Sequence, residues 1–143
     1  MFVDASAMIA ILTEEADGQS LAAAIDQAQS TTPITSVLAV WEAAVGLYRK
    51  KSIPMAEAKD RVAEFLQHAH VEIVPLGKEE LTLALQAFDR YGRHRYPDSE
   101  RNRALNLADC FHYACAKSHG ASILHKDPGF TFTDIVSAVH KAV

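Results

Sequence analysis

Short apolar, β-rich runs alternate with longer helical stretches along this sequence, and that alternation restricts the possible folds more than any other feature. The runs are Met1–Asp4, Thr31–Thr35, Val71–Leu76 and Ala121–His125. Strands that alternate with helices or helix pairs are typical of an α/β domain with a parallel sheet. The sequence therefore predicts the α/β class, with a central, mostly parallel sheet of about four short strands wrapped by helices.

The stretches between these runs carry helix signals. Ser6 and Ser36 stand at predicted N-cap positions, the first before Met8 and Leu12 and the second before a helix that runs to Lys51. Further helices are predicted from about Gly18 to Gln29, from Pro54, over Gly77–Tyr91 and over Leu107–His119. The polar segment Gly92–Asn106 is predicted to be a loop, and the apolar segment Phe130–Val143 to pack against the body.

Length, charge and hydropathy set the broad class. The 143 residues suit one ordinary domain, and because no repeat or linker divides them we expect a single domain over 1–143. No apolar run approaches the roughly 20 residues of a membrane span. Asp4 stands where a signal peptide would be apolar, so we expect a cytoplasmic protein without membrane contact. The net charge of −4 argues against a protein that coats nucleic acid non-specifically.

Three acids stand where a carboxylate could take part in chemistry. Asp4 ends an apolar run before a helix, at the sheet edge where α/β proteins bind ligands, although capping that helix explains it equally well. Glu42 lies on an apolar helix stripe and needs a partner, a cation or access to water. Asp109 begins an apolar helix, where the helix dipole also favours an acid. Ser6 and Asn106 could orient these carboxylates.

Two further acids and an arginine-rich segment have both structural and functional interpretations. Asp127 lies in a Lys-Asp-Pro-Gly turn and Asp134 at a potential helix cap, and each position is explained by local structure alone. Five arginines fall within fourteen residues, namely Arg90, Arg93, Arg95, Arg101 and Arg103. They could contact an RNA backbone, or they could simply be the charged side chains of a solvent-exposed loop.

Other chemistries lack their characteristic patterns. The seven histidines show no metal-binding spacing, and Cys110 and Cys115 suit neither a zinc site nor a disulfide scaffold, so we expect two buried thiols. The scattered glycines form no phosphate-binding loop, and Ser6 has no nucleophile-elbow context. Because these patterns are absent, the sequence favours carboxylate chemistry with a hard cation, Mg²⁺ or Mn²⁺, that bridges to phosphate.

Taken together, these residues resemble the PIN domain of VapC-type toxins, the ribonuclease half of bacterial toxin–antitoxin pairs. The matching pieces are Phe2–Leu12, Trp41-Glu42, Arg90–Arg93, Ala104–Lys117, and Ile123–Lys126 with Phe130 and Thr133–Ile135. They occur in the family's order over nearly the whole chain. The helix that begins Leu-Asn-Leu-Ala-Asp-Cys and the later Thr-Asp pair are the most specific of them.

The resemblance implies a Mg²⁺- or Mn²⁺-dependent endoribonuclease that cleaves RNA phosphodiesters with a metal-activated water and acts as the toxin of a type II pair. By motif position, Asp4, Glu42 and Asp109 are its metal ligands. Asp134 is then the fourth acid, or a residue that supports the metal-binding acids without contacting the metal. Asp127 is the alternative, because the family's Lys-Gly turn reads Lys-Asp-Pro-Gly here.

The resemblance also implies a homodimer and a cognate VapB-type antitoxin that enters the acidic groove. The segment Tyr96–Arg103 is longer than the family pattern, which affects contacts with substrate or partner. Two alternatives stay open. One is a PIN-type nuclease that processes RNA or cuts DNA outside a toxin pair. The other is a binding module with a degenerate site, against which the three intact central acids count.

Overall fold

The computed structural model describes residues 1–28 and 30–138. Its strands are β1 (Phe2–Val3), β2 (Ile34–Ser36), β3 (Glu72–Val74) and β4 (Ile123–Leu124). They form one parallel sheet in the order β3-β2-β1-β4, in which Phe2 lies opposite both Ile34 and Ile123. The parallel sheet predicted from the sequence is therefore confirmed, with strands shorter than the apolar runs that indicated them.

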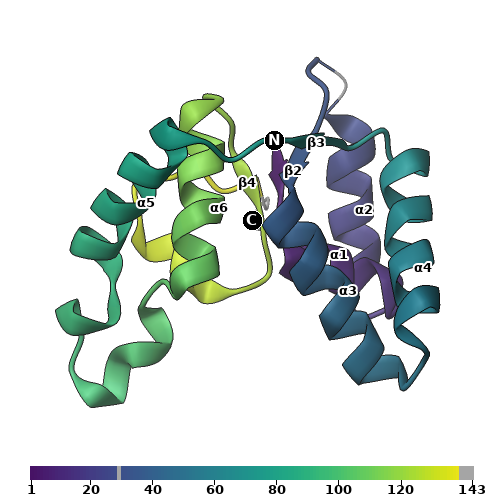
Figure 1. The fold of residues 1–143 in the computed structure, drawn as a ribbon, viewed down its shortest axis with the longest axis horizontal. Coiled ribbons are helices and arrows are strands. Elements are labelled where there is room, and N and C mark those ends of the chain that lie inside the picture. Colours follow the sequence, from purple (N-terminus) through teal and green to yellow (C-terminus); the bar gives the residue numbers. More distant parts are fainter. Residues whose placement is uncertain (29, 139–143) are drawn as a thin grey trace.

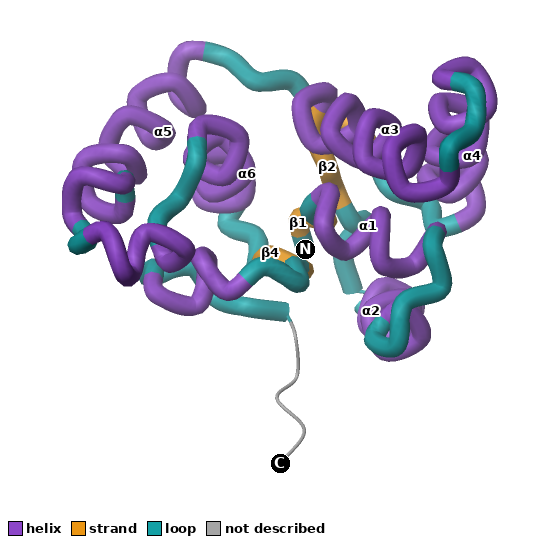
Figure 2. Tube along the Cα trace, turned by 90° about the horizontal axis from the view of Figure 1, so that it is seen from below, coloured by secondary structure: helices purple, strands orange, loops and turns teal. Residues whose placement is uncertain are grey.

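Within residues 1–28 and 30–138, six α-helices surround the sheet in two groups. They are α1 (Ala5–Leu12), α2 (Gly18–Gln27), α3 (Val37–Lys51), α4 (Met55–His68), α5 (Lys78–Tyr91) and α6 (Leu107–Ser118). Helices α1 to α4 lie on one side of the short strands and α5 and α6 on the other (Figure 1), and the view from below shows the same division (Figure 2). No helix among the described residues is long and apolar enough to cross a membrane.

Two sequence predictions about local structure need correction. The segment 92–106, predicted to be a loop, contains two 3₁₀ helices, η1 (Arg93–Arg95) and η2 (Asp98–Arg103); a third, η3 (Pro128–Phe132), follows β4. The N-cap of α1 is Asp4 and not Ser6, because the Asp4 side chain accepts the Ser6 backbone N–H at 3.2 Å. Ser36 does cap α3, since its Oγ accepts the Ala39 N–H at 3.2 Å.

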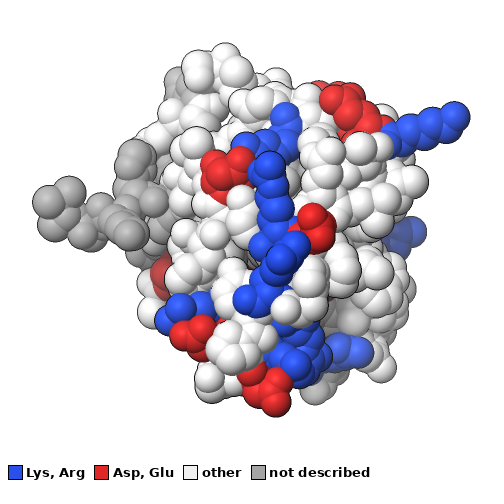
Figure 3. Space-filling view, turned by 90° about the vertical axis from the view of Figure 1, so that its left-hand side faces the viewer, with Lys and Arg blue, Asp and Glu red and all other residues white. Residues whose placement is uncertain are grey.

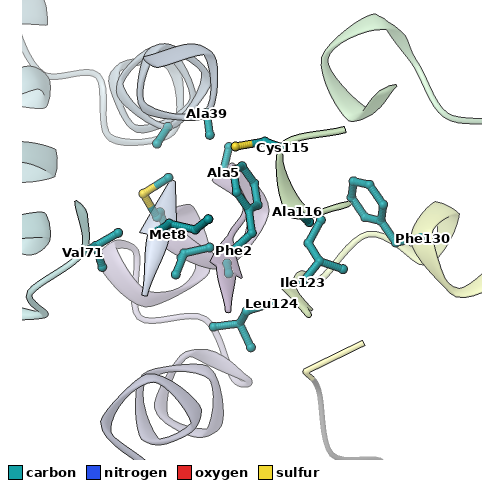
Figure 4. Packing of buried hydrophobic residues seen from close by; sticks show 14 of the residues in the cluster. Phe2, Ala5, Met8, Ala39, Val71, Cys115, Ala116, Ile123, Leu124 and Phe130 are labelled. Atoms are coloured by element: carbon teal, nitrogen blue, oxygen red, sulfur yellow. The ribbon is translucent and has the colours of Figure 1, made fainter. Parts of the chain in front are cut away.

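The core fills the space between the two groups of helices. Phe2 lies at its centre, with Met8 on one side and Ile123 and Phe130 on the other (Figure 4). Both residues of β1 are fully buried, as expected for a parallel strand covered on both faces. The two cysteines are buried and free, as predicted. Phe130 and Ile135 are buried against the body, while residues 139–143 of the predicted C-terminal packing segment lie outside the described residues.

The carboxyl ends of the strands bring distant segments to one edge. Asp4 follows β1 directly, and its backbone N–H donates to the Leu124 carbonyl of β4 at 3.0 Å. The next residues after β4, His125 and Lys126, therefore lie beside the start of α1. Since β2 leads straight into α3 at the same edge, three separate parts of the chain meet there.

Candidate active site

A cavity of about 330 Å³ opens at this edge of the sheet. Four of the five acids in its lining, Asp4, Glu42, Asp109 and Asp127, are acids that the sequence singled out, and they come from four parts of the chain. Ser6 and Asn106 also line it, together with Glu15, Lys50 and Lys126. The sequence named the first six of these residues, and the topology of the sheet brings them together.

Asp4 is the most deeply buried of the four acids, with 2% of its surface exposed. Its Oδ2 accepts the Ser6 hydroxyl at 2.6 Å as well as the Ser6 backbone N–H. Its Oδ1 is buried and has no hydrogen-bond partner among the described residues. One oxygen of Asp4 therefore caps α1, as one interpretation held, and the ligand-binding interpretation stays a prediction that the unbonded Oδ1 would suit.

Glu42 reaches from α3 to a buried histidine on α6. His112 is fully buried, its Nε2 hydrogen-bonds to Glu42 Oε1, and the same nitrogen lies 3.5 Å from Asp4 Oδ1. Burial opposes protonation of His112, but the hydrogen bond to Glu42 and the charges of the nearby acids raise its pKa overall. The imidazole thus fixes the Glu42 carboxylate at the wall of the cavity.

Asp109 is held by a capping box at the start of α6. Its backbone N–H donates to Asn106 Oδ1 at 2.8 Å, and its Oδ2 accepts the Asn106 backbone N–H at 3.1 Å. Burial raises the pKa of Asp109 to about 7; the Asn106 hydrogen bond opposes the shift, and the charges of Asp4 and Asp127 add to it. The capping box therefore holds a carboxylate where its negative charge is costly.

Asp127 reaches the cavity from the turn after β4. Its carbonyl accepts from His125 Nδ1 at 2.7 Å, which fixes the turn. Burial raises the pKa of the Asp127 carboxyl, and the charge of Asp4 raises it further. Asp127 and Asp109 therefore both belong to a set of carboxylates that repel one another.

The donor set fits a divalent cation. Asp4, Glu42 and His112 each offer one ligand atom, and these atoms lie within 4.8 Å of one another. Asp4 Oδ1 accepts no hydrogen bond from the described residues and lies 3.5 Å from His112 Nε2. A cation would stabilise the ionised Asp109 carboxylate, whose pKa is raised by burial and, to a smaller extent, by the charges of Asp4 and Asp127. Carboxylate oxygens dominate the cavity, which suits hard ions.

Comparison with known proteins decides the family. The PIN domain family matches residues 1–135. The chain is 34% identical to a ribonuclease VapC of Mycolicibacterium smegmatis, over 98% of this chain and all of that one. A VapC ribonuclease of Rhizobium meliloti is 32% identical, over 94% of this chain and 98% of that one. The chain belongs to the PIN-domain family of VapC ribonucleases.

The fold of this PIN domain also matches a solved relative. The crystal structure of VapC20 from Mycobacterium tuberculosis, described as a toxin that cleaves the sarcin-ricin loop, superposes with a TM-score of 0.67. The match covers 94% of this chain and 95% of that one, at 18% identity. At this identity the likeness concerns the fold. The PIN family also implies the use of a divalent metal, which agrees with the carboxylates of the cavity.

Asp134, which the sequence favoured as the fourth acid, does not line the acidic cavity. Its carboxylate accepts the hydroxyl groups of Tyr113 at 2.5 Å and Tyr91 at 3.3 Å, and pairs with Lys117 at 3.0 Å. The Tyr113 hydrogen bond in particular lowers the pKa of Asp134. Asp134 thus ties the C-terminal segment to α5 and α6, while Asp127 opens into the cavity, and which of the two is the fourth acid stays a prediction.

The predicted RNA-contacting arginines are not part of the wall of the acidic cavity. Figure 3 shows Lys and Arg side chains running as a strip with acidic side chains beside them, on the face that carries α5. Arg95, Arg101 and Arg103 pair with local acids at 3.2, 2.7 and 3.5 Å. Neither these three nor Arg90 and Arg93 are among the described residues that line the acidic cavity. Their contact with RNA stays a prediction.

Sequence reasoning missed one residue of this PIN domain that a simple signal could have found. His112 follows Asp109 by three residues on α6, so both point to the same side of that helix. It also missed Glu15, Lys50 and Lys126 as parts of the cavity wall. These three come from the connection between α1 and α2, the last turn of α3 and the turn after β4, and their meeting depends on the tertiary fold.

Proposed function

We propose that this chain is a toxin endoribonuclease of the VapC type, and that the acidic cavity is its active site. The observation that carries the assignment is the buried Asp4 Oδ1, which accepts no hydrogen bond from the described residues and lies 3.5 Å from His112 Nε2, where Glu42, Asp109 and Asp127 also open into the cavity. A lone buried carboxylate oxygen is costly unless a cation or a donor completes it. The ribonuclease names of the related VapC proteins support the same conclusion.

The proposed metal ligands are Asp4, Glu42 and Asp109, and the proposed ion is Mg²⁺ or Mn²⁺. When bound, such an ion supplies a reactive water at neutral pH and neutralises charge on the phosphate. Ser6 holds Asp4 so that Oδ1 stays available, and Asn106 fixes the Asp109 carboxylate through the capping box. The ammonium groups of Lys50 and Lys126 and the buried imidazole of His112 then position the acids and the substrate.

His112 acts in this proposal as a positioning residue for Glu42. Its Nε2–H donates to the Glu42 carboxylate, which selects one orientation of a long, otherwise mobile side chain. Oxygen ligands suit Mg²⁺ better than an imidazole nitrogen does, so we assign the metal to the carboxylates. Asp127 completes the set as the fourth acid.

The proposed partners are an RNA substrate, a second copy of the chain and a VapB-type antitoxin that enters the acidic cavity. An apolar surface beside the active site supports the homodimer. It is formed by Val37, Leu38, Trp41, Leu76 and Phe111. The Trp41 side chain is 63% exposed although it directly precedes Glu42, so a second copy seated here would lie next to the active site.

The test of the proposed function is cleavage of RNA by the purified protein with Mg²⁺ or Mn²⁺. We expect the wild type to cut single-stranded RNA internally, EDTA to stop the reaction, and Asp109→Ala to abolish it while circular dichroism shows a folded protein. A matched single-stranded DNA is the control substrate. Unchanged cleavage by Asp109→Ala, or cleavage of the DNA alone, would overturn the assignment.

A further inference from the structure

Two lysines from distant parts of the chain meet on one carboxylate in the wall of the acidic cavity. Lys50 lies in the last turn of α3 and Lys126 in the turn after β4. Lys50 Nζ bonds to Glu15 Oε1 at 2.6 Å, and Lys126 Nζ bonds to Glu15 Oε2. Each oxygen of the carboxylate therefore has its own ammonium group.

This arrangement is fixed to the catalytic acids by a short chain of hydrogen bonds. The Lys126 backbone N–H donates to Ser6 Oγ at 2.9 Å, and the Ser6 hydroxyl donates to Asp4 Oδ2 at 2.6 Å. Asp17 Oδ1 lies 3.5 Å from Lys126 Nζ and adds a second acid nearby. The position of Lys126 relative to Asp4 thus follows from the fold and does not depend on a flexible loop.

This network of ion pairs contributes little to the stability of the fold. The Lys50 and Lys126 side chains are 54% and 42% exposed, and exposed ion pairs contribute little to stability. Lys50 also lies at the carboxyl end of α3, where the helix dipole favours a cation without any partner. The hydrogen bonds from Lys126 and Lys50 lower the pKa of Glu15 to about 2, so the carboxylate stays ionised under ordinary conditions.

An RNA strand in this cavity needs such cations. The four acids repel the phosphates on either side of the one being cut, since only the metal-bound phosphate has its charge offset. Lys50 and Lys126 are the cationic side chains among the described residues that line the cavity. A phosphodiester presents two non-bridging oxygens that share one negative charge, as a carboxylate does, so it can accept hydrogen bonds from the same two ammonium groups.

We propose that Lys50 and Lys126 form a binding subsite for an RNA backbone phosphate next to the one that is cleaved. In the RNA-free protein Glu15 occupies this subsite, and it gives up the two ammonium groups when the phosphate enters. The inference rests on the ribonuclease function proposed above and adds the residues that hold the strand beside the catalytic acids.

The test measures RNA binding in an Asp109→Asn background, which prevents cleavage. The probe is a short, fluorescently labelled single-stranded RNA of mixed sequence, titrated at several salt concentrations. Lys126→Gln and Lys50→Gln should each weaken binding, and the double variant should reduce the slope of log affinity against log salt by about 0.7, the value for one single-strand phosphate contact. Lys126→Arg should keep most of the affinity.

Glu15→Gln separates a phosphate subsite from a merely structural ion pair. Removing the competing carboxylate frees both lysines, so RNA should bind several-fold more tightly even if the melting temperature falls slightly. The exposed pair Glu57–Arg61 on α4 supplies matched controls, because Glu57→Gln and Arg61→Gln make the same charge changes away from the cavity. These two should change affinity much less than their counterparts in the cavity.

The outcomes distinguish this inference from the proposed function. If the wild type cleaves RNA but the lysine variants bind like Arg61→Gln, the subsite is wrong and the ribonuclease assignment stands. Equal effects of Glu15→Gln and Glu57→Gln would also overturn the role of Glu15, since they would reflect net charge alone. A wild type that neither cleaves nor binds RNA would overturn the function itself.

Discussion

Replacing Asp109 by asparagine should stabilise the metal-free protein at neutral and alkaline pH, although it removes a proposed metal ligand. An asparagine keeps the capping interactions with Asn106, because its side-chain oxygen can still accept the backbone N–H. What it removes is a negative charge that burial and the carboxylates of Asp4 and Asp127 make unfavourable. The substitution therefore exchanges metal binding for stability.

The magnitude follows from the pKa of Asp109, which folding raises from 3.8 to about 7. The folded state holds its proton more tightly than the unfolded state, so stability is lost as pH rises from about 4 to 7 and levels off above. Three pKa units correspond to about 4 kcal/mol at most, and partial solvent access reduces this to about 2–4 kcal/mol. For a chain of this size that is roughly 8 to 15 °C in melting temperature.

The assay compares thermal unfolding of the wild type and Asp109→Asn in EDTA from pH 4 to pH 8. The difference in melting temperature should be near zero at pH 4 and should grow in favour of the variant up to about pH 7. Mg²⁺ at a hundred times its dissociation constant should then raise the free energy of unfolding of the wild type by about 3 kcal/mol, and that of the variant much less. A difference that does not depend on pH, or a variant less stable at pH 8, would refute this reasoning.

Three further outcomes are expected. Asp127→Asn should lower the rate of RNA cleavage by roughly a hundredfold, whereas Asp134→Asn should leave it unchanged; the reverse result would restore Asp134 as the fourth acid. Gly18→Ala should lower the free energy of unfolding in urea by about 1–3 kcal/mol, because its Cβ would lie 2.7 Å from the Ala10 carbonyl oxygen, and a neutral effect would contradict that close packing. Trp41→Lys should convert a dimer into a monomer in light scattering, and an unchanged mass would remove the proposed interface.

The sequence by itself determined the secondary structure and the class of fold. Periodicity and turn residues identify the strands and helices because these signals are local, and the Ser36 cap and the Asn106–Asp109 spacing mark where α3 and α6 begin. The order of motifs also indicated the family. Asp4, Glu42 and Asp109 could be named in advance since each interrupts an apolar pattern with a charge.

Only the tertiary structure decided which side chains share the cavity. Asp127 and Asp134 are seven residues apart in similar contexts, and the chain path after β4 directs the first into the cavity and the second to Tyr113. The bonds from Glu15 to Lys50 and Lys126 span 35 and 111 residues. Such contacts are set by strand order and helix packing, which no local pattern encodes. Each acid could therefore be identified from the sequence alone. Their pKa values and cationic neighbours depend on the sheet edge at which the acids meet.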